Sequence, residues 1–447
     1  MESQPTNPQV SESPGGFFYG WRIVIVGVLL MGVVFGTIIN LFSLFAAPVA
    51  KELGATTGDF SLAYSVITLA ALPMSPIIGN LLKRIDARIL VSAGLIVAVL
   101  ANLLLSSAKA MWMVYAAAVL QGVGLIAATT IPISVMITNW FVRHRGLALG
   151  LATAGSGLGS LVLVPVITNT IASLGWRSAY LVLAGIQAVL IPIAFLVLRN
   201  RPEQRGLTAL GAAPATPTGM GEAATANGSR TAPVRAGLTQ SQVYKTSTFW
   251  LLAAALVFSG ISVNGMISVL APMLTDMGAT KDIGVWVLST LGIFVMIGKF
   301  GTGWLFDKAG VGKAIFLVAL ANAAQFIFML SPTNLANATL FTALHGFGAT
   351  MVTVTPAYLA ATLFGDRDYA AVYGSVSIFS TLGAVLAAPF GLLFYTGKSG
   401  SPTALVWAWL VMALIGWALY LVTVRTRPQW ERTGAAETAD ATAGTVR

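Results

Sequence analysis

The sequence predicts an all-α membrane protein with twelve transmembrane helices, arranged as two six-helix halves with both termini in the cytoplasm. Of its 447 residues, 56% are hydrophobic and 9% are charged, and the mean hydropathy is +0.83, outside the range of soluble domains. Hydrophobic runs long enough to cross a bilayer recur twelve times, and Lys and Arg gather on one side of them. We therefore expect a multi-pass protein of the cell (inner) membrane.

The hydrophobic runs form two sets of six, separated by a polar stretch. Residues 199–247 are rich in Ala, Gly, Pro, Thr and Arg, and this composition predicts a flexible cytoplasmic linker. We expect an N-terminal half at 19–198, a C-terminal half at 248–424, and cytoplasmic tails at 1–18 and 425–447. The runs lie at 19–48, 60–82, 89–107, 111–138, 146–173, 176–198, 248–275, 284–306, 314–331, 334–363, 370–395 and 404–424.

The distribution of positive charge sets the orientation. With both tails inside, 19 of the 25 Lys and Arg residues fall on the cytoplasmic side, as the positive-inside rule requires. The formal charge of +10 therefore reports topology, and we expect no nucleic-acid partner. The absence of cysteine and the presence of only two histidines leave little for a metal site, and no cofactor is expected.

Lys299, in the run at 284–306, is the one charged residue that these runs place at membrane depth. A charge there costs about 3 kcal/mol on insertion scales, so it usually faces a cavity or a partner. Asp307, at the expected membrane boundary, follows eight residues later, which places Lys299 about 12 Å inside. The plain alternative is a lysine that snorkels to the interface. Because the membrane holds no opposite charge, we expect Lys299 to bind an anionic substrate.

Polar residues near the middle of other runs are candidate hydrogen-bond donors to that anion. A carboxylate that leaves water needs a cation and several donors in exchange. For each hydroxyl the alternative is a bond to its own helix. His345 is the other titratable group at depth, and it either relays protons together with Lys299 or is a neutral group between helices. The candidate donors are Asn40, Gln121, Thr130, Asn264, Ser377, Ser380 and Thr381.

The run at 146–173 begins with five glycines at short spacing. Small residues three and four apart let helices pack closely and slide, so we interpret them as a packing face. They are Gly146, Gly150, Gly155, Gly157 and Gly159.

Two basic turns repeat between the halves. Gly79 to Arg88 reads GNLLKRIDAR, and Gly303 to Lys313 reads GWLFDKAGVGK at the matching place. These turns resemble the signature of the major facilitator superfamily, which implies twelve helices and alternating access. In the N-terminal copy Lys83 stands where that family has aspartate. We expect the turns to act as conformational loops through Gly79, Arg84, Arg88, Gly303, Asp307 and Lys308, with Arg143 and Arg145 after the fourth run.

Two further stretches resemble the monocarboxylate transporters and the related oxalate/formate antiporters. They are FFYGW, ending at Trp21, and WFVRHRGLALGLATAGSG, beginning at Trp140. In those relatives helix eight carries a substrate-binding arginine, and Lys299 occupies the matching position. The chain departs from the animal transporters at Val295, where those transporters have an aspartate. It departs from the oxalate antiporter at Ser380, where the antiporter has a second cation.

We therefore expect a secondary active transporter for a small monocarboxylate such as lactate, pyruvate or formate, working as a monomer by proton-linked symport. The alternative is a carboxylate exchanger of the oxalate/formate type. A proton-coupled exporter of drugs is less favoured because the runs contain no embedded acid, and a sensor would be expected to carry a soluble domain. No catalytic constellation emerges, so an enzyme is not expected.

Overall fold

The computed structural model describes residues 18–212, 236–394, 401–426 and 428. The elements in these ranges are all helices, and nine of them are long and apolar enough to cross a membrane, or ten if one bent pair counts as a single span. The expected all-helical, multi-pass architecture is confirmed. Residues 1–17, 213–235 and 429–447, which hold most of the expected tails and the middle of the expected linker, lie outside the described residues.

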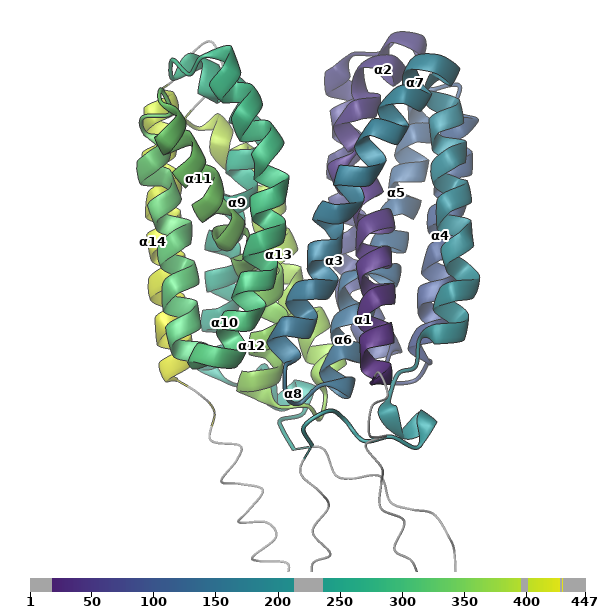
Figure 1. The fold of residues 1–447 in the computed structure, drawn as a ribbon, viewed down its shortest axis with the longest axis vertical. Helices are drawn as coiled ribbons and strands as arrows, with labels where there is room; N and C mark the ends of the chain where they lie inside the picture. The colour runs from purple at the N-terminus through teal and green to yellow at the C-terminus, as the bar shows by residue number, and fades with distance from the viewer. Residues whose placement is uncertain (1–17, 213–235, 395–400, 427, 429–447) are drawn as a thin grey trace, which may run out of the picture.

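The first half of the chain forms the bundle on the right of Figure 1. Its third helix begins with a capping box, in which Thr56 and Asp59 bond each other's backbone N–H groups. The elements are α1 (Tyr19–Leu30), the π-helical η1 (Met31–Asn40), η2 (Phe42–Phe45), α2 (Ala46–Glu52), α3 (Thr57–Leu81), α4 (Ala87–Ser106), α5 (Met111–Ala128), α6 (Thr130–Trp140) and α7 (Arg145–Val197).

The second half forms the bundle on the left of Figure 1, and two short helices lie between the halves in the chain. The connecting helices are η3 (Pro202–Arg205) and α8 (Gln240–Val243). The bundle contains α9 (Ser247–Asp276), α10 (Lys281–Met329), α11 (Leu335–Gly348), η4 (Ala349–Val352), α12 (Val354–Phe364), α13 (Tyr369–Leu392) and α14 (Pro402–Arg425).

Single residues interrupt the helices at two junctions between predicted runs and inside two predicted runs. Helices α7 and α10 each contain one non-helical residue, Gly175 (φ 80°, ψ 165°) and Gly310 (φ 75°, ψ 164°), where the sequence predicts a boundary between two runs. Glycine adopts this positive φ without a steric penalty. Thr129 interrupts the fourth predicted run between α5 and α6, and the tenth bends by 42° before Val354. The sequence analysis did not predict these last two breaks.

The two bundles meet along two seams, α7 with α10 and α3 with α13. A Cβ atom on Gly150 would lie 2.5 Å from the Lys299 carbonyl oxygen, and one on Gly374 would lie 3.2 Å from the Cα of Gly79. On its other face α7 packs against the first transmembrane segment, where Gly159 meets Gly32. The predicted packing role of the α7 glycines is confirmed.

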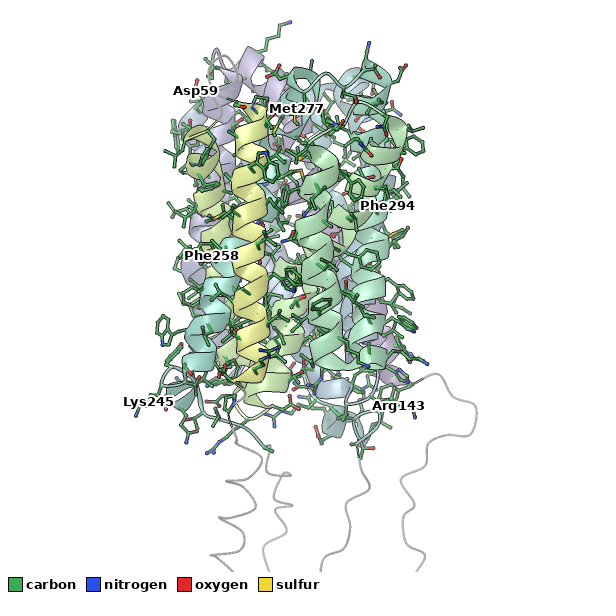
Figure 2. All side chains as sticks on the ribbon, turned by 90° about the vertical axis from the view of Figure 1, so that its left-hand side faces the viewer. Asp59, Arg143, Lys245, Phe258, Met277 and Phe294 are labelled. Atoms are coloured by element: carbon green, nitrogen blue, oxygen red, sulfur yellow. The ribbon has the colours of Figure 1, made fainter. Side chains whose placement is uncertain are left out.

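The described ends of the linker are bound to the bundles. Leu210 accepts hydrogen bonds from the backbone N–H groups of Val142 and Arg143, at 3.0 and 2.9 Å. In the second half, Leu238 donates to the carbonyl of Phe364 at 2.9 Å. We call the end of the molecule that carries these bonds the linker end, where Figure 2 labels Arg143 and Lys245, and the opposite end, with Asp59 and Met277, the far end.

Candidate functional site

Lys299 lies at the seam between the two halves. Its side chain is 4% exposed, and it projects from α10 toward α7. The Nζ atom donates to the hydroxyl of Ser156 at 2.7 Å and to the carbonyl of Thr153 at 3.3 Å. The ring of Phe35 lies 5.8 Å away, a weak cation–π contact. The lysine is therefore buried and does not snorkel to the surface.

The partners of Lys299 are neutral. A buried ion needs an opposite charge or a full set of hydrogen bonds, because burial removes its hydration. Two neutral acceptors leave a third ammonium proton without a partner among the described residues. In those residues the ion pairs all lie elsewhere: Lys83 with Asp368, Arg88 with Asp86, Arg145 with Asp366, and Arg177 with Glu52. Lys299 is thus a cation whose counter-charge the described chain does not supply.

Asn40 shares a partner with Lys299. Its Nδ2 atom donates to the Ser156 carbonyl at 3.2 Å and to the Ser160 hydroxyl at 2.7 Å, and Ser160 donates to the same carbonyl at 3.0 Å. Asn40 ends the π-helical segment η1, so three transmembrane segments contribute to one polar group. The structure therefore brings Asn40 and Lys299 together through Ser156. We call Lys299, Ser156, Ser160 and Asn40 the seam cluster.

Sequence reasoning missed Ser156 and Ser160. Both lie in the stretch read as a glycine packing face, and a serine inside a helix usually bonds its own backbone. The signal that was available is their spacing: Thr153, Ser156 and Ser160 recur at three and four residues, so they share a face with the small glycines.

Gln121 belongs to a different polar group. It donates to Asn102 at 3.4 Å, Asn102 donates to Gln187 at 2.8 Å, and Gln187 donates to Thr37 at 3.0 Å. This chain links α5, α4, α7 and η1 inside the first half. Its members satisfy each other, as buried polar groups must. Gln121 has no described contact with the seam cluster.

The candidate donors of the second half bond their own helices. Asn264 donates to Gly260 at 3.0 Å, Ser377 to Tyr373 at 2.8 Å, and Thr381 to Ser377 at 3.1 Å. These are the local bonds named above as the alternative. Ser380 differs, because its buried hydroxyl has no partner among the described groups. Thr130 is half-buried at the start of α6, beside the break at Thr129. None has a described contact with Lys299.

His345 forms a third group within the second half. Its Nδ1 atom lies 2.7 Å from the Gln325 side-chain oxygen, and Gln325 donates in turn to Asn322 at 2.7 Å. The Nε2 atom is buried without a partner among the described residues. No described contact joins this group to Lys299, so the expected joint relay has no continuous path in this conformation.

Comparison with known protein families matches residues 27–342 to a family described as Major Facilitator Superfamily. This match covers more than half of the chain. The chain belongs to the Major Facilitator Superfamily. It is therefore a transporter of the multi-pass class, and nothing in the described structure indicates catalytic activity.

Several curated facilitators are similar to it at low identity. Human monocarboxylate transporter 12 is 23% identical over 309 residues, which are 67% of this chain and 59% of the relative. Rat monocarboxylate transporter 13 is 24% identical over 385 residues, 85% of this chain and 83% of the relative. The oxalate:formate antiporter of Oxalobacter formigenes is 25% identical over 399 residues, 86% and 89% of the two chains. This chain thus spans less than two thirds of monocarboxylate transporter 12.

The signature turns of this facilitator join the two bundles at the linker end. Asp307 accepts hydrogen bonds from the backbone N–H groups of Gly146 and Leu147, at 2.9 and 2.8 Å, and so caps the start of α7. A carboxylate is stabilised there by free N–H groups and the helix dipole. Arg145 supports the same corner through an ion pair with Asp366 at 3.0 Å.

The N-terminal signature turn also binds the other bundle, but through a lysine where the C-terminal turn uses an aspartate. Lys83, at the position of Asp307 in the repeat, forms an ion pair with Asp368 at 3.2 Å. Asp368 is the N-cap residue of α13, so both turns bind the first turn of a helix in the other bundle. Gly79 and Gly374 allow the backbones to approach there. The departure of Lys83 from the family pattern is compensated by an acid on the partner helix.

The other predicted loop residues have smaller roles. Arg88 lies 3.7 Å from Asp86 and 5.5 Å from the Phe195 ring, and the backbone of Arg143 binds Leu210. Arg84 and Lys308 are exposed at the linker end.

Proposed function

We propose that the chain is a secondary active transporter that moves a small monocarboxylate across the cell (inner) membrane by alternating access. The observation that carries the proposal is Lys299, a buried cation at the seam whose described partners are neutral. A single carboxylate can supply the missing charge and displace the neutral acceptors. The similarity to monocarboxylate transporters and to an oxalate:formate antiporter supports a small organic anion as the substrate.

We further propose twelve crossings, with the linker end in the cytoplasm. Helices of 53 and 49 residues would span about 80 and 74 Å if straight, whereas a bilayer core is about 30 Å thick. Each is therefore interpreted as two crossings that meet at Gly175 or Gly310. The bent pair α11–η4 and α12 supplies one more crossing. The positive charge at the linker end supports a cytoplasmic location for both tails.

The conformation suits entry of the anion from the far end. The described hydrogen bonds and ion pairs between the bundles lie at Lys299 or toward the linker end, so the described residues provide no such bond on the far-end side of Lys299. An anion that reached Lys299 would replace Ser156 and Thr153 on the ammonium. This exchange would remove two hydrogen bonds between the halves, which is how binding would favour the rearrangement.

Coupling to protons is the finer part of the proposal. In an empty, closed cavity, desolvation favours the neutral amine, and a bound carboxylate restores the ammonium. Proton and anion then load together, which is symport. If the empty site keeps its proton, return requires another anion, which is exchange; the similarity to the oxalate:formate antiporter over 86% of this chain favours this second candidate.

Proteoliposomes without internal substrate test the proposal. Symport predicts uptake of labelled lactate, pyruvate or formate that is driven by an inward proton gradient and collapses with a protonophore. Exchange predicts uptake only when the liposomes are preloaded with a carboxylate. Absence of carboxylate uptake in both formats, by protein shown to be folded, would refute the proposed substrate class.

A further inference from the structure

A groove lies between the second segment of α10 and the last turns of α14, away from the seam. Its volume is about 470 Å³, within the range of about 300–1,000 Å³ that is usual for ligand pockets. Figure 2 shows α14 in yellow on the face toward the viewer. The lining residues are Gly312, Lys313, Phe316, Leu317, Leu421, Val424 and Arg425.

The walls of the groove are apolar and face outward. Phe316 and Leu317 are 43% and 48% exposed, and the ring of Phe316 lies 5.2 Å from that of Trp417 in an edge-on contact. Exposed aromatic and aliphatic side chains on transmembrane segments contact lipid tails, because lipid is their solvent. The body of the groove is therefore suited to an acyl chain.

Two exposed cations line the linker end of the groove. Lys313 lies three residues after the break at Gly310, and Arg425 is the last residue of α14. The lining contains no acid, and neither cation has a described ion pair. By contrast, Lys83 and Arg145 at the same end are paired. The groove thus combines an apolar floor with two unpaired positive charges at one end.

We propose that this groove binds an anionic phospholipid of the cytoplasmic leaflet. The phosphate lies between Lys313 and Arg425, and an acyl chain runs along Phe316, Leu317 and Leu421. Basic pockets between transmembrane helices on the cytoplasmic side have the chemistry that binds such headgroups. A zwitterionic lipid brings its own positive group and gains less from the two cations. The proposal depends on the orientation given above and not on the transported substrate.

The binding experiment uses the full chain in detergent, with phosphatidylglycerol or phosphatidylcholine of identical acyl chains added and the retained lipid counted by native mass spectrometry. Phosphatidylglycerol should be retained in preference. Each cation removed should weaken its retention about fivefold, so that Lys313→Gln/Arg425→Gln loses most of it. Lys308→Gln is the matched control, because Lys308 is an exposed cation at the same end that does not line the groove.

Three results would overturn the proposal. The first is equal retention of the two lipids. The second is an effect of Lys308→Gln as large as that of the double variant, which would indicate general surface charge. The third is displacement of phosphatidylglycerol by millimolar inorganic phosphate, which would indicate a free-anion site without a role for the acyl chain. Retention that falls in the double variant alone and resists inorganic phosphate supports the lipid site.

Discussion

Ser156→Ala tests whether, in the absence of substrate, the Ser156 hydroxyl occupies the place beside Lys299 that a substrate carboxylate would take. The change removes the hydroxyl that lies 2.7 Å from Lys299 Nζ, at a side chain that is 2% exposed. Alanine is smaller, so it introduces no clash. The carbonyl of Thr153, at 3.3 Å, remains as a weaker partner of the ammonium. If Ser156 occupies the place of the substrate carboxylate, its removal should make substrate binding tighter.

The size of the effect follows from the bond that is lost. A hydrogen bond to a charged group contributes about 1.5–3 kcal/mol. The remaining bond to the Thr153 carbonyl recovers part of this, so the empty variant is destabilised by about 1 kcal/mol. The anion no longer has to displace the hydroxyl, and its dissociation constant should fall roughly fivefold, since about 1.4 kcal/mol is a factor of ten.

The assay is equilibrium binding of lactate, pyruvate or formate, the proposed substrates, to purified protein, by calorimetry. Thr170→Ala is the control: it removes a back-bonding hydroxyl from a half-buried site on the same helix, away from Lys299, and should leave affinity unchanged. A dissociation constant that rises in Ser156→Ala would refute the reasoning, because it would make Ser156 a direct ligand of the substrate.

Three more outcomes are expected. Lys299→Met should abolish specific uptake while the protein still folds and inserts, because removing a buried cation without a counter-charge relieves an energetic cost. Lys299→Arg should keep partial uptake. Normal uptake by the methionine variant would contradict the role of Lys299 in the site. Monocarboxylates should compete for uptake better than dicarboxylates of similar size, because the second carboxylate loses its hydration without a partner; stronger competition by oxalate or succinate would reveal a missed cation. Lys83→Asp should open the linker end by placing two acids together, and adding Asp368→Lys should restore closure. The chain has no native cysteine, so spin labels on introduced cysteine pairs can measure this opening; a double variant as open as the single one would show that the pair does not hold the seam.

The long apolar helices were predictable because a membrane span needs a long apolar run. The breaks at Thr129 and Thr353 were not predicted, although a signal was present: Pro132 and Pro356 each follow a break by three residues. A proline has no N–H to bond the carbonyl four residues earlier, and its ring clashes with that carbonyl, so each helix is interrupted just before its proline. Gly175 and Gly310 fall where the sequence predicts boundaries, but the helices run almost to the glycine on both sides.

Of the seam cluster, the sequence singled out Lys299 and Asn40 as candidates and missed Ser156 and Ser160. Lys299 stands out because a charge at membrane depth is costly, and the structure buries it at the seam. Gln121 was also predicted as a site residue because it is polar and lies mid-helix, yet it donates to Asn102 within one bundle. Which polar residues meet depends on helix rotation, and hydropathy does not fix rotation. Ser156 was missed because small polar residues are common in packed membrane helices, so its presence there was not a signal.

The ion pair between Lys83 and Asp368 makes the α3–α13 seam respond to ionic strength differently from the α7–α10 seam. Lys83 and Asp368 are 34% and 25% exposed, so mobile ions reach them, with a screening length of about 8 Å at physiological salt. Asp307 binds backbone N–H groups that cannot move away from the helix start, and these short bonds are less sensitive to salt. Rising salt should therefore loosen the α3–α13 seam before the α7–α10 seam. The carrier would then begin to open at the linker end along one seam, although its two halves repeat the same design.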